Sequence, residues 1–240
     1  MNLDKLAIEI FKKYPGGQGI TSSDLPDRIS FPKNITKRIK SIERYTNKNT
    51  KDQGAAGWEY AFSVLLVQDE LYISSVQSGN YENVKVSHSY KVRPEIDQKR
   101  NKLQLIIRFD NLTIKSKYYE LQEFTPPIIH GLIATFHTHP KYFYNRHTFQ
   151  YTFFSPQDIF ALVYGRTPVL GLIAGGDIWL AVKTVNAKQI PGELLLEASK
   201  IELQAGMDAV KNFVKQQMRN FGICFYYGKV GGTFTKINAQ

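Results

Sequence analysis

Apolar residues recur at helical spacing in the first part of the chain and at strand spacing after it. One stripe predicts a helix over 3–14, ended by Pro15-Gly16-Gly17, and another predicts a lysine-rich helix over 35–45. The polar stretch 46–57 follows the second helix. Beyond it, strand patterns over 60–67, 71–76, 84–92 and 103–109 predict a β-meander.

The second half of the chain predicts a buried strand, a hairpin and a long helix. Residues 128–136 form an apolar run that leads directly to His137, and strands over 169–174 and 178–182 flank Gly175-Gly176-Asp177, a hairpin signal. Apolar spacing predicts a helix over 194–213, then strands over 221–227 and 233–237. No internal repeat appears, so we expect an α+β domain over 32–240 with an N-terminal helical extension over 1–31.

Composition indicates a globular protein without a membrane segment. The chain has 240 residues, 42% of them hydrophobic and 22% charged, enough for a full core. It contains no run of about 18 apolar residues and no secretory signal, so we expect a cytoplasmic protein. Cys224 is the only cysteine, which excludes internal disulfides and multi-cysteine zinc sites.

The net charge of +10 is concentrated near the N-terminus. Residues 1–51 hold eleven Lys and Arg against five Asp and Glu, so the remaining residues carry only +4. This distribution weakens a nucleic-acid role, for which a basic surface would otherwise argue. Two interpretations stay open: a solvated helical surface, or a surface for an acidic partner.

Two short motifs carry the candidate chemistry. In His137-Thr138-His139-Pro140, residues i and i+2 of an extended backbone point to the same side, so both imidazoles can reach one ion. Ser155-Pro156-Gln157-Asp158 is typical of a helix start, with Ser at N-cap, Pro at N1 and an acidic residue at N3. Asp158 can serve that cap and also complete a three-ligand zinc site.

A glutamate, then His-x-His-Pro, then Ser-x-x-Asp resembles the JAMM motif of the MPN-plus zinc metalloproteases. The resemblance implies an MPN-like, cytidine-deaminase-like layered fold, with a curved mixed sheet flanked by helices. It implies Zn²⁺ held by His137, His139 and Asp158, an oxyanion role for Ser155, and Glu59 as the base. The implied activity is isopeptidase or deubiquitinase-like hydrolysis at the C-terminal tail of a ubiquitin-like or small carrier protein.

The chain departs from the family pattern at two places. Phe62 stands where a glycine usually follows the catalytic glutamate, and Glu70 is the nearest acidic competitor of Glu59. The spacer 141–154 is long, with fourteen residues of which seven are aromatic. These aromatic residues either cover the core or form a lip that grips substrate.

The other histidines have weaker claims to a metal. His147 lies in the spacer and is predicted to be exposed, His130 is predicted on the face of its strand opposite His137, and His88 has no partner at ligand spacing. The sequence thus predicts a zinc-dependent hydrolase, with or without an activating protein partner. The alternatives are a non-catalytic MPN-like scaffold and, less favoured, a nucleic-acid-associated protein.

Overall fold

The structure is a computed structural model that describes residues 3–14, 19–48, 57–79, 84, 89–121, 129–144, 147–150, 152–187, 222–237 and single positions between 193 and 216. Its continuous helices in that part of the chain are α1 (Leu3–Lys13), α2 (Lys33–Lys48) and α3 (Pro156–Tyr164). The strands of the central sheet are β1 (Arg28–Ser30), β2 (Tyr60–Val67), β3 (Glu70–Ile73), β4 (Gln77–Ser78), β8 (Ile129–Thr138), β11 (Val169–Ala174), β12 (Asp177–Lys183), β13 (Ile223–Lys229) and β14 (Thr233–Lys236). Two smaller sheets contain β5 (Tyr90–Asp97), β6 (Lys102–Phe109) and β7 (Leu112–Glu120), and β9 (Lys141–Tyr144) with β10 (His147–Gln150).

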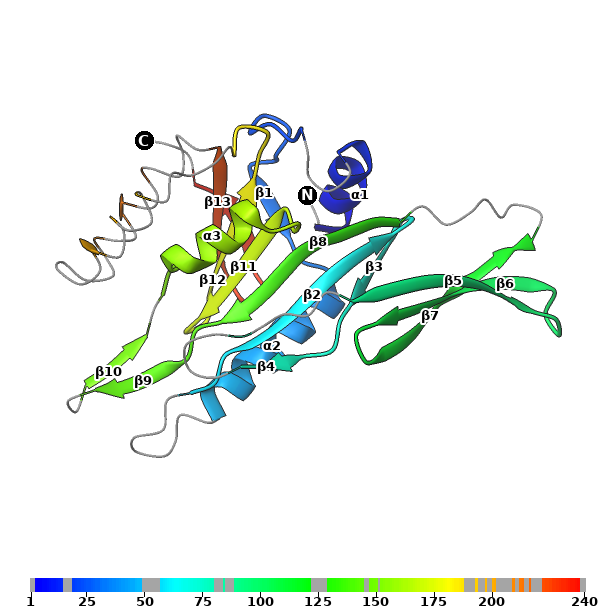
Figure 1. Ribbon diagram of the computed structural model, residues 1–240, viewed down its shortest axis with the longest axis horizontal. Helices are drawn as coiled ribbons and strands as arrows, with labels where there is room; N and C mark the ends of the chain where they lie inside the picture. Colours follow the sequence, from blue (N-terminus) through cyan, green and yellow to red (C-terminus); the bar gives the residue numbers. More distant parts are fainter. Residues whose placement is uncertain are drawn as a thin grey trace.

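The nine-stranded central sheet is mixed (Figure 1). Its order is β1-β14-β13-β12-β11-β8-β2-β3, with β4 also paired to β2. β8 and β11 are parallel, and α3 lies between them in the chain, so the three elements form a crossover unit. In such a unit the helix begins near the carboxyl end of the first strand. The start of α3 is therefore brought close to the end of β8.

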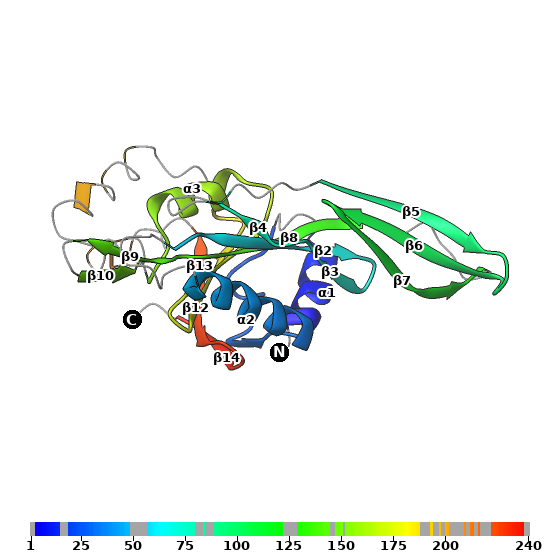
Figure 2. The ribbon, with the colours of Figure 1, turned by 90° about the horizontal axis from the view of Figure 1, so that it is seen from below.

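Helices cover both faces of the central sheet. α1 and α2 lie on one face and α3 on the other (Figure 2). Alternation along β2 matches this arrangement, because Phe62, Val64 and Leu66 pack with residues of α1 and α2 in one buried cluster. A second cluster joins Ile159 and Leu162 of α3 to the opposite face of β11 and β12.

β5, β6 and β7 form a three-stranded arm that projects from the central sheet (Figure 1). Its inner face carries Leu103, Leu105 and Ile107, which pack with Leu65 and Val67 on the side of β2 that faces away from α2. The arm lies at the end of β2 and β8 opposite to the hairpin of β9 and β10 (Figure 1). The arm therefore packs at one end of β2 and β8, and the β9–β10 hairpin follows the other end.

The N-terminal residues share the main core of the molecule. Leu3, Leu6 and Phe11 of α1 are buried in the same cluster as the inner residues of α2 and β2. β1 pairs with β14 at the edge of the central sheet. Within the described residues, no helix combines the length and apolar character needed to cross a bilayer.

The α+β prediction and most predicted elements are confirmed. β2 and β11 have the predicted limits, and α1, α2, β3, β6, β8, β12, β13 and β14 match their predictions with shifted ends. Most of the predicted helix 194–213 lies outside the described residues. Ile201 and Phe213, which are described, are helical and pack against the cluster beneath α3.

Other expectations were wrong, for identifiable reasons. The meander divides into two sheets, since β2 and β3 belong to the central sheet and β6 to the arm. The strand expected over 84–92 is β5, which begins at Tyr90 and continues to Asp97, and residues 85–88 lie outside the described residues. β7 was missed because Ser116, which is buried, occupies an inward position where an apolar residue would continue the strand pattern.

Candidate metal centre

His137 and His139 lie at the carboxyl end of β8. His137 is paired with Ala61 of β2 and Leu172 of β11, and it points to the α3 side of the sheet. The backbone N–H of His139 donates to the Ile173 carbonyl at 3.1 Å, which continues the pairing with β11 beyond the strand end. Both imidazoles are buried, with 5% and 4% of their residue surface exposed. The predicted i, i+2 placement is therefore present.

Asp158 reaches these histidines from the first turn of α3. Ser155 is the N-cap: its hydroxyl accepts from the Asp158 N–H at 3.2 Å, while the Ser155 N–H donates to Asp158 Oδ2 at 2.8 Å. The Ser155 hydroxyl also donates to the same oxygen at 2.8 Å. The predicted capping box thus forms, and it fixes the carboxylate that faces the two imidazoles.

The three side chains converge with separations that suit one metal ion. The Nε2 atoms of His137 and His139 are 3.2 Å apart, and they lie 3.1 Å and 3.3 Å from the two Asp158 carboxylate oxygens. Each residue offers one ligand atom, and the three atoms all lie within 4.8 Å of one another. Tetrahedral zinc with ligand bonds of about 2.0–2.1 Å places its ligand atoms roughly 3.3 Å apart. The group can therefore hold a metal ion without rearrangement of the backbone.

The electrostatics of Asp158 favour its charged form. Burial alone would raise the pKa of this carboxyl, but the charge and hydrogen bonds of His137 and His139 outweigh burial and hold its pKa well below the usual range. The positive end of α3 acts in the same direction. Asp158 is thus an anionic ligand at neutral pH.

Glu59 lies beside this group just before β2. Ala61 pairs with His137 in the antiparallel register, so two residues earlier Glu59 falls on the same face, level with His139. The Glu59 carbonyl accepts from the Gly79 N–H at 2.9 Å, and 7% of the residue is exposed. Burial raises the pKa of its carboxyl to about 7, with nearby Asp158 adding to the rise and His139 opposing it.

Glu70 is excluded as an alternative to Glu59. It begins β3 opposite Val67, at the far end of β2 from Glu59. Its carboxylate accepts from the Tyr72 hydroxyl at 2.5 Å and pairs with Lys117 of the arm at 3.1 Å. Glu70 therefore joins the arm to the central sheet and does not reach the histidines.

The side chains of three residues support the site although no role was predicted for them from sequence: Thr46, Thr138 and Gln150. Thr138 points away from the histidines, and its hydroxyl lies 2.6 Å from that of Thr46 and accepts from the Tyr60 N–H at 3.0 Å. Gln150 of β10 donates to the His139 carbonyl at 2.9 Å. Strand alternation could have indicated Thr138, since a residue between two ligands must face the opposite layer. No local signal indicated Gln150.

The remaining predicted histidines do not join the site. His130 lies at the other end of β8, where burial and the nearby Lys12 lower its pKa. Two register shifts between β2 and β8 interrupt the strand alternation between His130 and His137, so the opposite facing of His130 stays a prediction. His88 and the side chain of His147 lie outside what the structure describes.

Phe62 and the end of the aromatic spacer are core residues. Phe62 stacks on Phe136 at 5.0 Å on the α2 side of the sheet, so its bulk points away from the histidines. Phe153 and Phe154 are buried in the cluster beneath α3. These two residues cover the core, while the other five aromatic side chains of the spacer lie outside the described side chains.

No family model matches the chain, and no curated protein or solved structure does either. The chemistry of the site is therefore argued from its own atoms. Two imidazole nitrogens and one carboxylate leave a bound divalent ion with room for further ligands. A buried carboxyl with a pKa of about 7 beside them can both accept and donate a proton.

Proposed function

We propose that the chain is a zinc-dependent hydrolase of amide or isopeptide bonds, with chemistry like that of the JAMM metalloproteases. The observation that carries the proposal is the convergence of His137, His139 and Asp158 beside the buried Glu59. Residues from β8, α3 and the start of β2 meet there in the arrangement that the JAMM resemblance implies. An MPN-like assignment of the curved mixed sheet belongs to the same proposal.

Zinc is the metal that the donor set favours. Two imidazole nitrogens and one carboxylate form a common catalytic zinc set, whereas magnesium and calcium prefer oxygen ligands only. A bound zinc ion would supply a Lewis acid and lower the pKa of a water molecule to near neutrality. His137, His139 and Asp158 would hold it, one atom from each.

Glu59 would move the proton during hydrolysis. Its carboxylate would accept a proton from the attacking water and return it to the departing amine nitrogen. In the metal-free site the pKa of this carboxyl is about 7, and a bound divalent cation would lower it, so that Glu59 would start as the carboxylate that the first step needs. Gly79 holds the backbone of Glu59, which limits where its carboxylate can point.

Ser155 would stabilise negative charge on the carbonyl oxygen of the substrate. Its hydroxyl now donates to Asp158 Oδ2, and a rotation about one side-chain bond would redirect that donor. A donor placed at a developing oxyanion contributes about 3 kcal/mol to the transition state. Its position beside the ligand carboxylate supports this role.

Exposed aromatic residues adjoin the site residues in sequence. Trp58 directly precedes Glu59, and Phe160 lies two residues after Asp158, with 51% and 48% of their surfaces exposed. The Phe160 ring packs on exposed Tyr164 at 4.4 Å. Such rings provide contact area for a protein segment. Phe160 lies two residues from Asp158 on α3, and so on a different side of the helix, where an extended tail leaving the metal site would meet it. The rings therefore suit a substrate tail, as of a ubiquitin-like or small carrier protein, more than a free small molecule.

A non-catalytic scaffold is the second candidate. The contacts of 3.1 to 3.3 Å among His137, His139 and Asp158 would also hold these side chains together without an ion. In a scaffold they would form a buried polar cluster that fixes α3 on the sheet. Zinc content and hydrolysis distinguish this role from the enzyme.

The test combines metal analysis with a substrate panel. Purified wild-type protein, loaded with zinc and dialysed, should retain about one zinc ion per chain, and His137→Ala/His139→Ala should retain none. A panel of ubiquitin-like proteins with C-terminal amide-linked fluorophores should then show chelator-sensitive release by the wild type. Zinc retention without release from any member would support the scaffold, and absence of zinc would reject the metal centre itself.

A further inference from the structure

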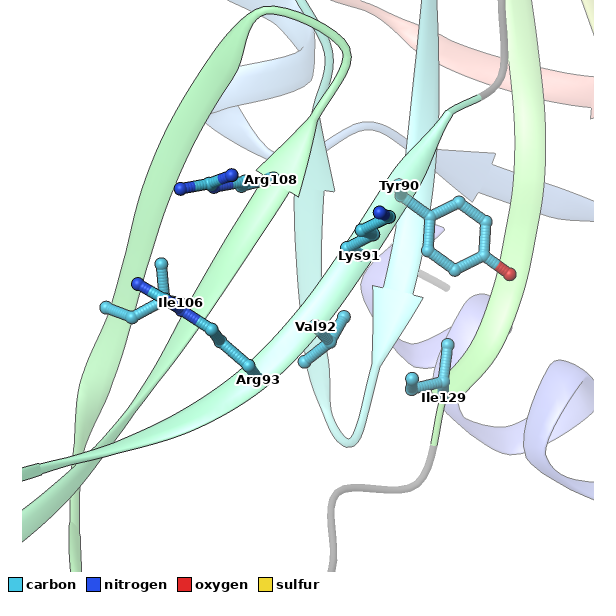
Figure 3. A pocket seen from close by; sticks show the side chains of 7 residues that line it. All are labelled: Tyr90, Lys91, Val92, Arg93, Ile106, Arg108 and Ile129. Carbon is cyan, nitrogen blue, oxygen red and sulfur yellow. The ribbon is translucent and has the colours of Figure 1, made fainter.

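The arm carries a second candidate binding site, far from the histidines. A groove of about 460 Å³ lies where β5 and β6 meet the start of β8 (Figure 3). Three cationic side chains line it, Lys91, Arg93 and Arg108, together with the apolar residues Val92, Ile106 and Ile129. Figure 3 shows the cations arising from the two arm strands and Ile129 from the neighbouring strand. No acidic side chain is part of this lining.

Two of the cations stand directly opposite each other. Lys91 of β5 pairs in register with Arg108 of β6, and Arg93 follows on the same face opposite Ile106. Like charges at directly opposed positions destabilise a sheet. Arg93 has an exposed carboxylate, Glu95, at 3.7 Å, but Lys91 and Arg108 have no ion pair within the described part of the chain. Among the described residues, this arrangement leaves concentrated positive charge on Lys91 and Arg108 without a counterion.

Other cations of the same arm do have carboxylate partners. Lys102 pairs with Glu120 at 2.8 Å, and Arg100 lies 3.8 Å from Asp97. Lys99 and Lys115, also on the arm, have no carboxylate partner among the described residues, so what distinguishes the groove is that Lys91 and Arg108 stand directly opposite each other. An anionic group bound between Lys91 and Arg108 would remove the repulsion and form charge-assisted hydrogen bonds.

The apolar part of the groove indicates what accompanies that anion. Ile129, at the start of β8, is 43% exposed and gives the groove an apolar side, whereas Ile106 is 4% exposed beneath the stems of the surrounding side chains. An extended chain with acidic and aliphatic residues two positions apart, and so on one side of the chain, would meet the cations and this apolar side together. A nucleic-acid strand would favour several aromatic rings for base stacking, and Tyr90 is the single ring in this lining.

We propose that this groove binds an extended acidic segment of a protein partner, through carboxylates on Lys91, Arg93 and Arg108. The proposal is independent of zinc and of hydrolysis. β8 connects the two sites, because it runs from Ile129 at the groove to His137, a span of roughly 26 Å at about 3.3 Å per residue. A partner held by the arm could thus be presented along the sheet.

The test measures binding and stability on one variant. A fluorescein-labelled peptide with the repeat Glu-Ser-Val-Ser, which places Glu and Val on one side of an extended chain, should bind the wild type in low salt by fluorescence anisotropy, and the analogue with Gln in place of Glu should not. Lys91→Glu should weaken binding more than about tenfold. The same change should raise Tm by about 1–3 °C, because it converts a repulsive cross-strand pair with Arg108 into an attractive one.

Lys33→Glu, an exposed position of α2, is the matched control with the same change in net charge. It should leave peptide affinity within about twofold of wild type. Equal losses in Lys33→Glu and Lys91→Glu would show non-specific attraction and overturn the proposal. If an oligothymidylate binds more tightly than the peptide and Lys91→Glu abolishes that binding, the groove is a nucleic-acid site and the proposal is wrong. If the peptide does not bind the wild type at all, the proposal is wrong as well.

Discussion

The hydroxyl oxygens of Thr46 and Thr138 lie 2.6 Å apart in the buried contact between α2 and β8. Thr138 stands between the two histidines in sequence and faces the opposite layer, where it also accepts from the Tyr60 N–H. One threonine thus ties the end of α2 to the end of β8 and to the start of β2. The histidines and Glu59 are held in position from the face of the sheet that they do not occupy.

Thr138→Val should destabilise the protein and disturb the site. The change leaves the Thr46 hydroxyl and the Tyr60 N–H without their buried partner, at a cost of about 1–3 kcal/mol in the free energy of unfolding. Urea unfolding measures this cost. Thr46→Val is the control, since it keeps the bond to Tyr60 and should cost less. Equal stabilities of the two variants would contradict the role given to Thr138.

Glu59→Gln should abolish most hydrolysis while zinc is retained. The amide cannot accept the proton of the attacking water, so kcat should fall by about 10²–10⁴. Metal analysis should still show zinc, since Glu59 is not among the three ligands. Glu70→Gln, at the other end of β2, is the matched control and should keep near wild-type kcat. Full activity of zinc-loaded Glu59→Gln would disprove the assignment of the base.

The stability of the zinc-free protein should depend on pH through Glu59. Burial raises the pKa of this carboxyl from 4.5 to about 7, so the folded state binds a proton that the unfolded state has lost between these values. The free energy of unfolding should therefore fall as pH rises from 4.5 to 7, by up to about 3 kcal/mol. Thermal unfolding in a chelator, compared with Glu59→Gln, isolates this contribution. A wild-type profile parallel to that of the variant would contradict it.

The local parts of the site could be predicted from sequence, because they depend on short-range rules. Strand alternation placed His137 and His139 on one side, and the cap pattern at Ser155 predicted the first turn of α3. The order of β8, α3 and β11 along the chain also explains why Asp158 lies near the two histidines, since a crossover helix starts near the end of the preceding strand. The resemblance to the JAMM motif added Glu59, whose register opposite the histidines agrees with that choice.

Long-range packing could not be read in the same way. The hydrogen bond between Thr46 and Thr138 spans 92 positions, and no periodicity in either segment identifies the other. The division of the expected meander into two sheets is another example, because β6 has the same apolar alternation whether it pairs in the central sheet or in an arm. Such features depend on which surfaces meet, and a local pattern does not specify the partner surface.

Ser155→Ala should distinguish the contribution of Ser155 to helix capping from its contribution to hydrolysis. Loss of the N-cap hydroxyl should cost about 1 kcal/mol of stability, and loss of the bond to Asp158 Oδ2 should lower zinc affinity by about 10–100-fold. At saturating zinc, kcat should still be lower by about 10²-fold because the oxyanion donor is gone. Metal titration followed by kinetics at saturation measures the two effects. Full recovery of kcat with added zinc would leave Ser155 a structural role only.

Phe160→Ala/Tyr164→Ala should weaken substrate binding and leave the chemical step intact. Both rings are exposed on α3 and pack on each other at 4.4 Å, so their removal changes little of the buried core. A substrate tail held by these rings should lose contact area in the ground state and the transition state alike. KM should then rise about tenfold at constant kcat. Ile96→Ala, which removes an exposed apolar side chain from the arm, is the control and should leave both constants unchanged. A fall in kcat with constant KM would instead show that the rings position α3 and its ligand Asp158.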